Sequence, residues 1–357
     1  MNGPHENATP DGLCRRGFLQ TAALLGAGGA LSESLLQAGE APQLELSNTG
    51  PDKIPRKPFG RTRDKVSVIG LGGYSLGDAP SLKEAIAIVH EAIDAGVNFF
   101  DNAWEYHDGK SEDWMGKALK GRRDKVFLMT KVCTHGRDKK VGLRQLEESL
   151  KRLQTDHLDL WQVHECVYDN DPERHFAKGG VIEALDEAKK AGKVRYVGFT
   201  GHKNPAIHLK MLSYDYPFDS AQMPLNVFDA SYRSFQKHVL PEVNKRGMAA
   251  LGMKSLGGNG QPIIQGVATV EEALRYAMSL AVATTISGID SLAVLRQNLA
   301  IARGFKPMMA EEMEALRKRC APAAGDGHLE LYKSTMKYDG DVGRQQHGLP
   351  SHKELPL

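Results

Sequence analysis

Cysteine is scarce in this sequence, and the four that occur lie far apart, at Cys14, Cys133, Cys166 and Cys320. No pair has the short spacing that zinc or iron–sulfur sites normally use, and no disulfide framework is indicated. Cys133 and Cys166 adjoin predicted strand ends and are interpreted as small buried apolar residues. The dipeptide His164-Glu165 lacks a second histidine one helical turn later, so it is not a metalloprotease motif. The sequence therefore predicts no metal site.

The chain also lacks an excess of either charge and any long apolar run. Lys and Arg number 46 against 44 Asp and Glu, and no basic block is interleaved with aromatic residues. Nucleic acid is therefore not an expected partner. No apolar run is long enough for a stable membrane span. With 41% hydrophobic and 25% charged residues, the composition is that of a globular protein with a sizeable core. A small molecule is the expected partner.

The N-terminal residues differ in composition from the rest of the chain. Arg15-Arg16 precedes a weakly hydrophobic run from Thr21 to Leu31, which is similar to a twin-arginine export signal. Residues 1–41 are interpreted as this leader and residues 42–58 as a linker rich in Pro, Gly, Ser and Asn. The expected location is the periplasm or beyond, with the twin-arginine export machinery as a partner. No clean A-x-A cleavage site is present, so an amphipathic N-terminal helix on a cytoplasmic protein is the alternative.

From Phe59 onward, short apolar runs alternate with segments of helical period. The expected strands are Val66–Ile69, Val97–Phe100, Val126–Met129, Leu158–Val163, Val194–Phe199, Phe218–Gln222, Met248–Met253 and Val282–Ile286. Eight βα units of about 30 residues favour a closed parallel (β/α)8 TIM barrel, of the α/β class, over an open sheet. The barrel is assigned to residues 59–319. Residues 320–357 lose this rhythm and are interpreted either as a tail or as a segment that folds over the barrel mouth.

Polar residues follow several of the predicted strands, and in such a barrel they converge on one face. Asp101, Lys131 and His164 stand at three of these strand ends, and Tyr106 lies in the loop five residues after Asp101. A tyrosine is a poor acid at neutral pH, but a neighbouring Lys ammonium favours the phenolate. We expect Lys131 to lower the pKa of Tyr106, Asp101 to hold Lys131, and His164 to orient a substrate carbonyl.

Four motifs carry a resemblance to the aldo-keto reductase family between Phe59 and Ala302. They are GVNFFDNAWEYHDGKSEDWMGKAL around Tyr106, LMTKV around Lys131, DLWQVHE around His164, and GKVRYVGFTGH. The resemblance implies an NAD(P)H-dependent enzyme that transfers a hydride between a nicotinamide and an aldehyde, ketone or sugar-like carbonyl or alcohol. It also implies Asp101, Tyr106, Lys131 and His164 as the catalytic set, with Tyr106 as general acid and base.

The same resemblance implies an extended cofactor across the barrel mouth without a Rossmann domain. Ser75 stands where the run Gly70-Leu71-Gly72-Gly73 would need a third glycine, so the dinucleotide fingerprint is not met. By resemblance Gly73 and Tyr74 lie along the nicotinamide ribose, and Gln222 reads the carboxamide. The remaining cofactor contacts implied by the family are Thr200, Lys254, Leu256, Gly257, Gly288 and Asn298, of which the loop from Lys254 to Gly257 holds the pyrophosphate.

Three departures from the family pattern bear on the cofactor. Thr200-Gly201-His202 replaces a common Ser-Asn, which removes an amide and leaves more of the orientation to Gln222. Met253 replaces the aromatic residue that commonly stacks on the nicotinamide. The stretch SGIDSLAVLRQNL after the last strand offers only Arg296 for a 2′-phosphate. By the resemblance NADP(H) is still the preferred cofactor, with NAD(H) possible.

Three functions stay open at this point. The first is a carbonyl reductase or alcohol dehydrogenase. The second is a cofactor-binding sensor or regulatory subunit with slow turnover. The third is a redox-neutral sugar-modifying enzyme that retains its cofactor, an idea that rests on the leader because free nicotinamides are scarce outside the cytoplasm. Substrate identity depends on mouth loops that a sequence does not place.

Overall fold

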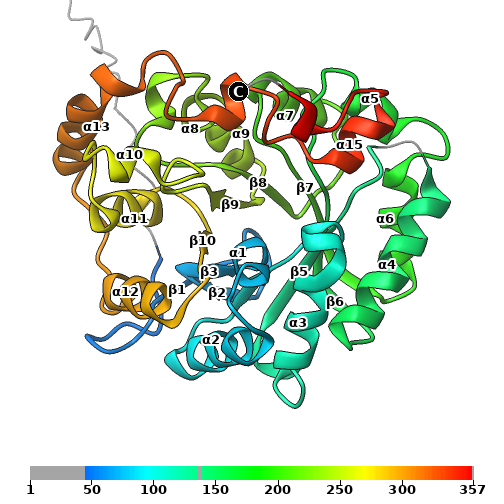
Figure 1. Cartoon of the computed structure of the whole chain (residues 1–357), viewed down its shortest axis with the longest axis horizontal. Helices are drawn as coiled ribbons and strands as arrows, with labels where there is room; N and C mark the ends of the chain where they lie inside the picture. The colour runs from blue at the N-terminus through cyan, green and yellow to red at the C-terminus, as the bar shows by residue number, and fades with distance from the viewer. Residues whose placement is uncertain (1–44, 136–137, 356–357) are drawn as a thin grey trace, which may run out of the picture. The chain divides into compact units, whose positions relative to one another are not determined.

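Eight parallel strands close into a barrel, which confirms the (β/α)8 TIM-barrel prediction (Figure 1). The computed structural model describes residues 45–135 and 138–355, so the predicted leader, residues 1–41, lies outside the described residues. The strands follow one another in chain order, and the last pairs with the first. They are β3 (Ile69–Gly72), β4 (Phe99–Asp101), β5 (Phe127–Val132), β6 (Leu158–Val163), β7 (Val194–Thr200), β8 (Ser220–Pro224), β9 (Ala249–Met253) and β10 (Thr284–Gly288).

Helices surround the strands, and their apolar faces are the ones that the sequence pattern indicates. In α2 the buried positions include Ala85, Val89 and Ile93; the Ser81 side chain caps the first turn and Gly96, with φ 103°, ends the helix. The helices are α1 (Gly73–Gly77), α2 (Leu82–Ala95), α3 (Lys110–Ala118), α4 (Lys139–Leu153), α5 (Asp171–Phe176), α6 (Val181–Lys190), α7 (Pro205–Leu212), α8 (Phe235–His238), α9 (Leu240–Lys245), α10 (Gln261–Ile264), α11 (Val270–Ser279), α12 (Leu292–Ala302), α13 (Ala310–Ala324), α14 (Leu331–Ser334) and α15 (Asp341–Gln346).

A two-stranded hairpin closes the amino-terminal end of the barrel. Strand β1 (Arg56–Pro58) pairs antiparallel with β2 (Lys65–Ser67), and Phe59 between them packs 4.6 Å from the ring of Phe127. The prediction of a single strand over Val66–Ile69 is therefore wrong, because Val66 belongs to β2 and Ile69 belongs to β3. Ser67 ends the first strand by binding Asn98, and β3 begins only at Ile69. Strand β1 also lies inside the predicted linker.

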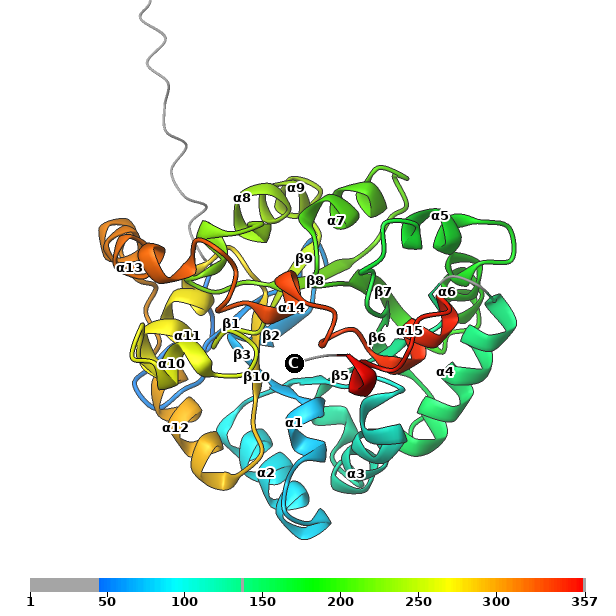
Figure 2. The ribbon, with the colours of Figure 1, turned by 45° about the horizontal axis from the view of Figure 1, so that its top comes forward.

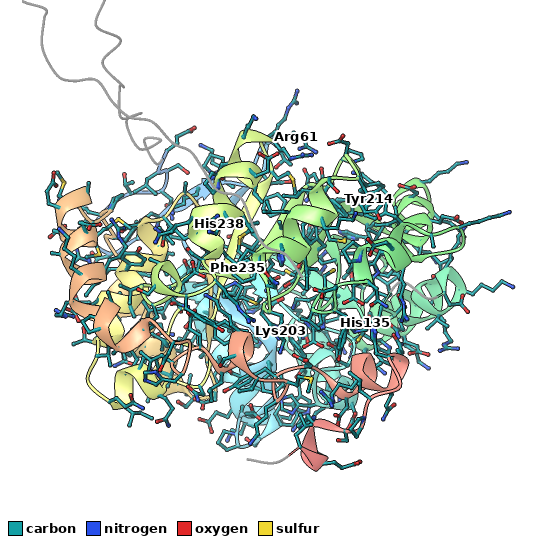
Figure 3. All side chains as sticks on the ribbon, turned by 90° about the horizontal axis from the view of Figure 1, so that it is seen from above. Arg61, His135, Lys203, Tyr214, Phe235 and His238 are labelled. Atoms are coloured by element: carbon teal, nitrogen blue, oxygen red, sulfur yellow. The ribbon has the colours of Figure 1, made fainter. Side chains whose placement is uncertain are left out.

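The C-terminal residues lie across the carboxyl ends of the strands, where Figure 2 shows α14 and α15 crossing the mouth. Helix α13 runs through the predicted end of the barrel at residue 319. Beyond it, the Gly340 N–H donates to Glu165 Oε2 at 2.8 Å. Lys203, labelled in Figure 3, binds the Thr335 carbonyl and lies 2.7 Å from Asp339. These contacts place residues 330–355, here called the mouth segment, over the proposed site.

No helix in the described ranges combines the length and the apolar character needed to cross a bilayer.

Candidate active site

Lys131 lies at the centre of the candidate active site and joins two of the other predicted catalytic residues. Its ammonium forms an ion pair with Asp101, donates to the Asn102 carbonyl at 2.7 Å and lies 3.3 Å from the Tyr106 hydroxyl. The Lys131 and Asp101 side chains are 1% and 6% exposed, so little solvent screens the pair. The ammonium is thereby fixed beside the tyrosine hydroxyl.

The barrel strands explain why these side chains meet. Asp101 is the last residue of β4 and Lys131 lies near the end of the adjacent strand β5. The following loop turns back at His107 and Asp108, which adopt left-handed φ values of 51° and 57°. The Trp104 N–H donates to the Lys131 carbonyl at 3.1 Å and fixes the start of this loop. Tyr106 is therefore held over the strand ends.

His164 lies on the other side of Tyr106, where it pairs with a carboxylate that the sequence analysis missed. The Tyr106 and His164 ring centroids are 5.6 Å apart, and His164 Nδ1 contacts Glu105 Oε1. This contact leaves Nε2 as the nitrogen for a substrate oxygen. Burial acts to raise the pKa of Glu105, but His164 and Lys131 hold it below its usual value. The sequence could have indicated a site role for Glu105 only through its position directly before Tyr106, in a loop at the barrel mouth.

The structure reverses the expected pKa shift of Tyr106. Burial raises the pKa of its phenol well above the usual value, and the charges of Asp101, Glu105 and Glu165 raise it further. These raising effects outweigh the Lys131 ammonium beside the hydroxyl, which is paired with Asp101. Tyr106 is therefore held as a neutral phenol, which is the form that can donate a proton to a developing alkoxide.

Gln222 is the residue that the family resemblance implies for a carboxamide contact. It lies in β8 and is 1% exposed, and its Oε1 has no hydrogen-bond partner among the described residues. Its Nε2 contacts the Met253 sulfur at 3.7 Å. An unpaired buried amide oxygen is costly unless a ligand satisfies it. Thr200 at the end of neighbouring β7 pairs in register with Gln222, so both predicted contacts belong to one edge of the mouth.

Lys254 begins the loop predicted to hold the pyrophosphate. It has a left-handed φ of 57°, and its ammonium lies 5.2 Å from the Tyr332 ring and 5.7 Å from the Tyr338 ring. Burial lowers its pKa to about 8, and it has no carboxylate within ion-pair distance among the described residues. Leu256 follows, and Gly257 has φ 79° with Pro262 2.5 Å from a hypothetical Cβ. A cation without an anionic partner in this loop suits a phosphate.

The other predicted cofactor residues differ in how directly the structure supports a contact. Tyr74 is 56% exposed and packs edge-on to Tyr106 at 5.3 Å, so it is open to a ligand. At Gly73 a Cβ would lie 2.4 Å from the Asp101 backbone carbonyl, so close packing alone requires glycine, whereas at Gly288 it would meet the Ser75 hydroxyl, at 2.6 Å. Asn298 is 2% exposed and donates to the Ser287 hydroxyl at 3.0 Å, which a packing role explains.

Arg296, the basic residue considered for a 2′-phosphate, is bound elsewhere. Its guanidinium makes two hydrogen bonds of 2.8 and 2.9 Å to the Glu91 carboxylate on α2. Arg296, the arginine that the sequence offered for a 2′-phosphate, is therefore already paired with a carboxylate.

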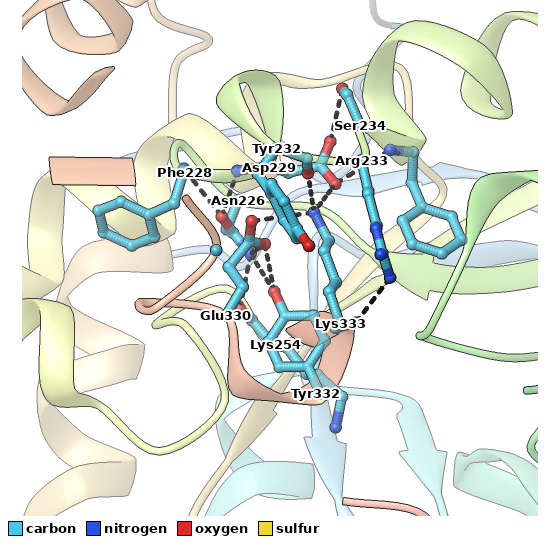
Figure 4. Close-up of polar contacts among 12 residues, drawn as sticks. Asn226, Phe228, Asp229, Tyr232, Arg233, Ser234, Lys254, Glu330, Tyr332 and Lys333 are labelled. Atoms are coloured by element: carbon cyan, nitrogen blue, oxygen red, sulfur yellow. Dashed lines mark hydrogen bonds and ion pairs between the residues drawn. The ribbon is translucent and has the colours of Figure 1, made fainter. Parts of the chain in front are cut away.

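A buried polar cluster fixes the mouth segment beside Lys254 (Figure 4). Lys333 Nζ lies 2.6 Å from Asp229 and 2.9 Å from Glu330, and all three side chains are at most 1% exposed. The Tyr332 hydroxyl donates to Glu330 and accepts from Asn226 at 2.9 Å. We call these five residues the mouth clamp. The sequence analysis missed it because the C-terminal stretch has no regular period and its partner Asp229 lies about a hundred residues earlier.

Comparison with known proteins decides the family. The model of the aldo/keto reductase family matches residues 68–260, more than half of the chain. The chain belongs to the aldo/keto reductase family. It is an oxidoreductase of the NAD(P)H-dependent type found in that family. The match spans β4 and β5, which carry Asp101 and Lys131, and β6, which His164 directly follows.

Relatives of this aldo/keto reductase extend over most of the barrel. The uncharacterized oxidoreductase YqkF of Bacillus subtilis is 27% identical over 73% of this chain and 95% of its own length. The L-galactose dehydrogenase of Arabidopsis thaliana is 33% identical, but over 42% of this chain and 49% of its own. This chain thus matches about half of the latter relative.

Solved structures show the same fold. The holo form of aldo-keto reductase AKR11C1 from Bacillus halodurans has a TM-score of 0.62 at 24% identity, covering 74% of this chain and 95% of that one. An aldo/keto reductase from Klebsiella pneumoniae, in complex with NADP and acetate, has a TM-score of 0.60 at 22% identity and covers 74% and 94%.

Proposed function

We propose that this aldo/keto reductase reduces an aldehyde, ketone or sugar-like carbonyl, or catalyses the reverse oxidation, with Tyr106 as the acid and base. The observation that carries the proposal is the Tyr106 hydroxyl, which lies 3.3 Å from a lysine ammonium held by Asp101. The Tyr106 proton would pass to the carbonyl oxygen, and Lys131 would stabilise the phenolate left behind. His164 Nε2 would orient that oxygen.

We propose NADP(H) as the cofactor, with NAD(H) possible. A bound nicotinamide would supply or accept the hydride at the carbonyl carbon. Gln222 fits its carboxamide because of the unpaired Oε1, and Lys254 fits the phosphates because it has no carboxylate partner in the described residues. The Klebsiella relative in complex with NADP supports this choice. The Arg296–Glu91 pair weakens the preference over NAD(H).

The test is a panel of carbonyl and sugar substrates with NADPH and NADH, run on the wild type beside Tyr106→Phe. We expect steady consumption of the reduced nicotinamide by the wild type. The variant should keep cofactor binding, measured by fluorescence quenching, and lose nearly all turnover. Tight binding without turnover by the wild type would favour the sensor, and full turnover by the variant would remove Tyr106 from its role.

The mouth clamp favours one second candidate, a redox-neutral enzyme that retains its cofactor. Buried ion pairs hold the mouth segment beside Lys254, so release of a cofactor through this side would have to break them. The signature would be nicotinamide that co-purifies with the protein, together with conversion of a sugar without net change in nicotinamide absorbance. Dependence of every turnover on added NADPH would exclude this candidate.

We also propose export through the twin-arginine machinery, with residues 1–41 as leader and periplasmic location as the result. The support is Arg15-Arg16 ahead of a weakly hydrophobic run. Cell fractionation of the full chain should find the wild type outside the cytoplasm and the Arg15→Lys, Arg16→Lys double variant inside it. Equal distribution of both would contradict the proposal.

A further inference from the structure

Two histidines and one aspartate converge beside the mouth segment, away from Tyr106. The Asp171 Oδ1 atom lies 3.3 Å from His135 Nδ1 and 2.9 Å from His347 Nε2. Asp171 and His135 are fully buried and the His347 side chain is 7% exposed. One ligand atom from each residue lies within 4.8 Å of the other two. His135, labelled in Figure 3, therefore belongs to a three-residue cluster that the proposed reaction does not use.

The cluster is fixed by separate elements. His135 follows β5, Asp171 begins α5 and His347 directly follows α15 of the mouth segment. The Asp171 Oδ2 atom accepts from the Val167 and Tyr168 N–H groups, both at 2.9 Å, which leaves Oδ1 for the two histidines. The Tyr168 ring stacks on His347 at 3.8 Å. The donor atoms are thus pre-positioned by backbone contacts and stacking.

A third histidine adjoins the cluster. His175, four residues after Asp171 on α5, is fully buried, and neither ring nitrogen has a hydrogen-bond partner among the described residues.

We propose that His135, Asp171 and His347 bind a divalent transition metal such as Zn²⁺ and so attach the mouth segment to the barrel. Two imidazoles and one carboxylate are a donor set that Zn²⁺ accepts, with a water or a shifted His175 completing four ligands. Mg²⁺ and Ca²⁺ are disfavoured because they prefer several oxygen ligands.

The sequence offered no short motif for this site. The metal ligands come from residues 36 and 176 positions away from Asp171, so spacing rules do not detect them. A separate group, Glu105, Cys133 and His164, also has donor atoms within 4.8 Å of one another and adjoins the proposed active site. Any test must separate these two groups.

The test is a titration of the full, chelator-treated chain with zinc chloride, followed by calorimetry and by metal analysis after dialysis. We expect one Zn²⁺ per chain, and His347→Gln should weaken binding by about 100-fold or more. His238→Gln is the control, because it removes an exposed histidine of α8 that is remote from the cluster (Figure 3). Its zinc affinity should equal that of the wild type.

Two further measurements keep the proposal falsifiable if His347→Gln fails to fold. Cobalt(II) bound to the wild type should give no thiolate charge-transfer absorption, whereas binding at Cys133 would. Zinc should also slow tryptic cleavage of the wild-type mouth segment, where Arg344 is fully buried. Failure of the wild type to bind zinc after chelation, equal binding by a folded His347→Gln, a thiolate band, or no zinc protection would each overturn the proposal.

Discussion

Two regions of the molecule combine a buried lysine, a carboxylate and a tyrosine, and they differ in which polar atoms are left unpaired. In the mouth clamp, Lys333 contacts Asp229 and Glu330, and the Tyr332 hydroxyl is bound to Glu330 and Asn226. At the proposed active site, Lys131 contacts Asp101, and within the described residues the Tyr106 hydroxyl has a hydrogen-bond contact with Lys131 alone, at 3.3 Å.

The difference separates a structural cluster from a reactive one. The polar side-chain atoms of the mouth clamp form hydrogen bonds and ion pairs with one another, so the mouth clamp serves to hold the mouth segment in place. Near Tyr106, buried polar atoms such as Gln222 Oε1 and Glu105 Oε2 have no partner among the described residues. Unpaired polar atoms around a partly exposed tyrosine mark the place where a cofactor and substrate complete the hydrogen bonds.

The largest expected effect is on catalysis. Lys131→Met should lower kcat by about 10²- to 10⁴-fold, because it removes the ammonium that lies 3.3 Å from the Tyr106 hydroxyl. Steady-state kinetics with a substrate from the panel measures it. Lys254→Met is the comparison, and it should act mainly on the KM for the cofactor. Equal losses of kcat in the two variants would remove the distinction between proton transfer and cofactor binding.

Breaking the mouth clamp should cost stability. Lys333→Met leaves Asp229 and Glu330 buried without a counter-ion, which should lower the free energy of unfolding by about 3–5 kcal/mol. Urea denaturation measures the loss, and adding Glu330→Gln to the variant should recover part of it. A loss below about 1 kcal/mol would show that the clamp is hydrated and not a buried pair.

Glu105→Gln should reduce kcat by about tenfold, because it removes the charge-assisted contact of about 1.5 kcal/mol that orients His164. Asp108→Asn, an exposed acid in the same loop, is the matched control. A kcat change of equal size in both variants would show that loop charge in general, and not the His164 contact, is responsible.

The last prediction concerns the pH dependence of stability at Lys57, a third buried lysine, which donates to the Met278 carbonyl at 2.5 Å and has no carboxylate within ion-pair distance in the described residues. Burial lowers its pKa to about 7 from 10.5. Between about pH 7 and pH 10.5, Lys57 is protonated in the unfolded chain and neutral in the folded chain, so the free energy of unfolding rises with pH. Relative to Lys57→Met, the wild type should gain up to about 1.4 kcal/mol per pH unit.

Urea unfolding at several pH values above 7 measures this slope, with the exposed Lys65→Met as control. Parallel pH dependence of the wild type and Lys57→Met would contradict the shifted pKa.

Much of the barrel could be predicted because parallel strands and amphipathic helices repeat a simple pattern. The runs at Leu158–Val163 and Val194–Phe199 are observed strands to within one residue. The run Val66–Ile69 was wrongly predicted as one strand. Its apolar residues belong partly to the hairpin of β1 and β2 and partly to the barrel, and periodicity does not distinguish the two. Strand β1 was missed because its composition resembles a linker.

The site was predictable only where strand ends fix the side chains. Asp101 and Lys131 follow from the strands, and the structure brings them together with Tyr106. Glu105 and the mouth clamp depend on loop conformation and on contacts between distant residues, which no local pattern encodes. The direction of the Tyr106 pKa shift was wrong because it depends on burial and on carboxylates whose distances only the folded chain sets.

The most direct test of the central claim is a single-turnover measurement of hydride transfer by enzyme loaded with reduced nicotinamide. Tyr106→Phe should slow the decay of nicotinamide absorbance by at least about 100-fold. Tyr276→Phe, at a buried tyrosine that bonds Gln236, should leave it within a few-fold of the wild type. A wild-type rate in the Tyr106 variant would contradict the assignment of this phenol as the proton donor.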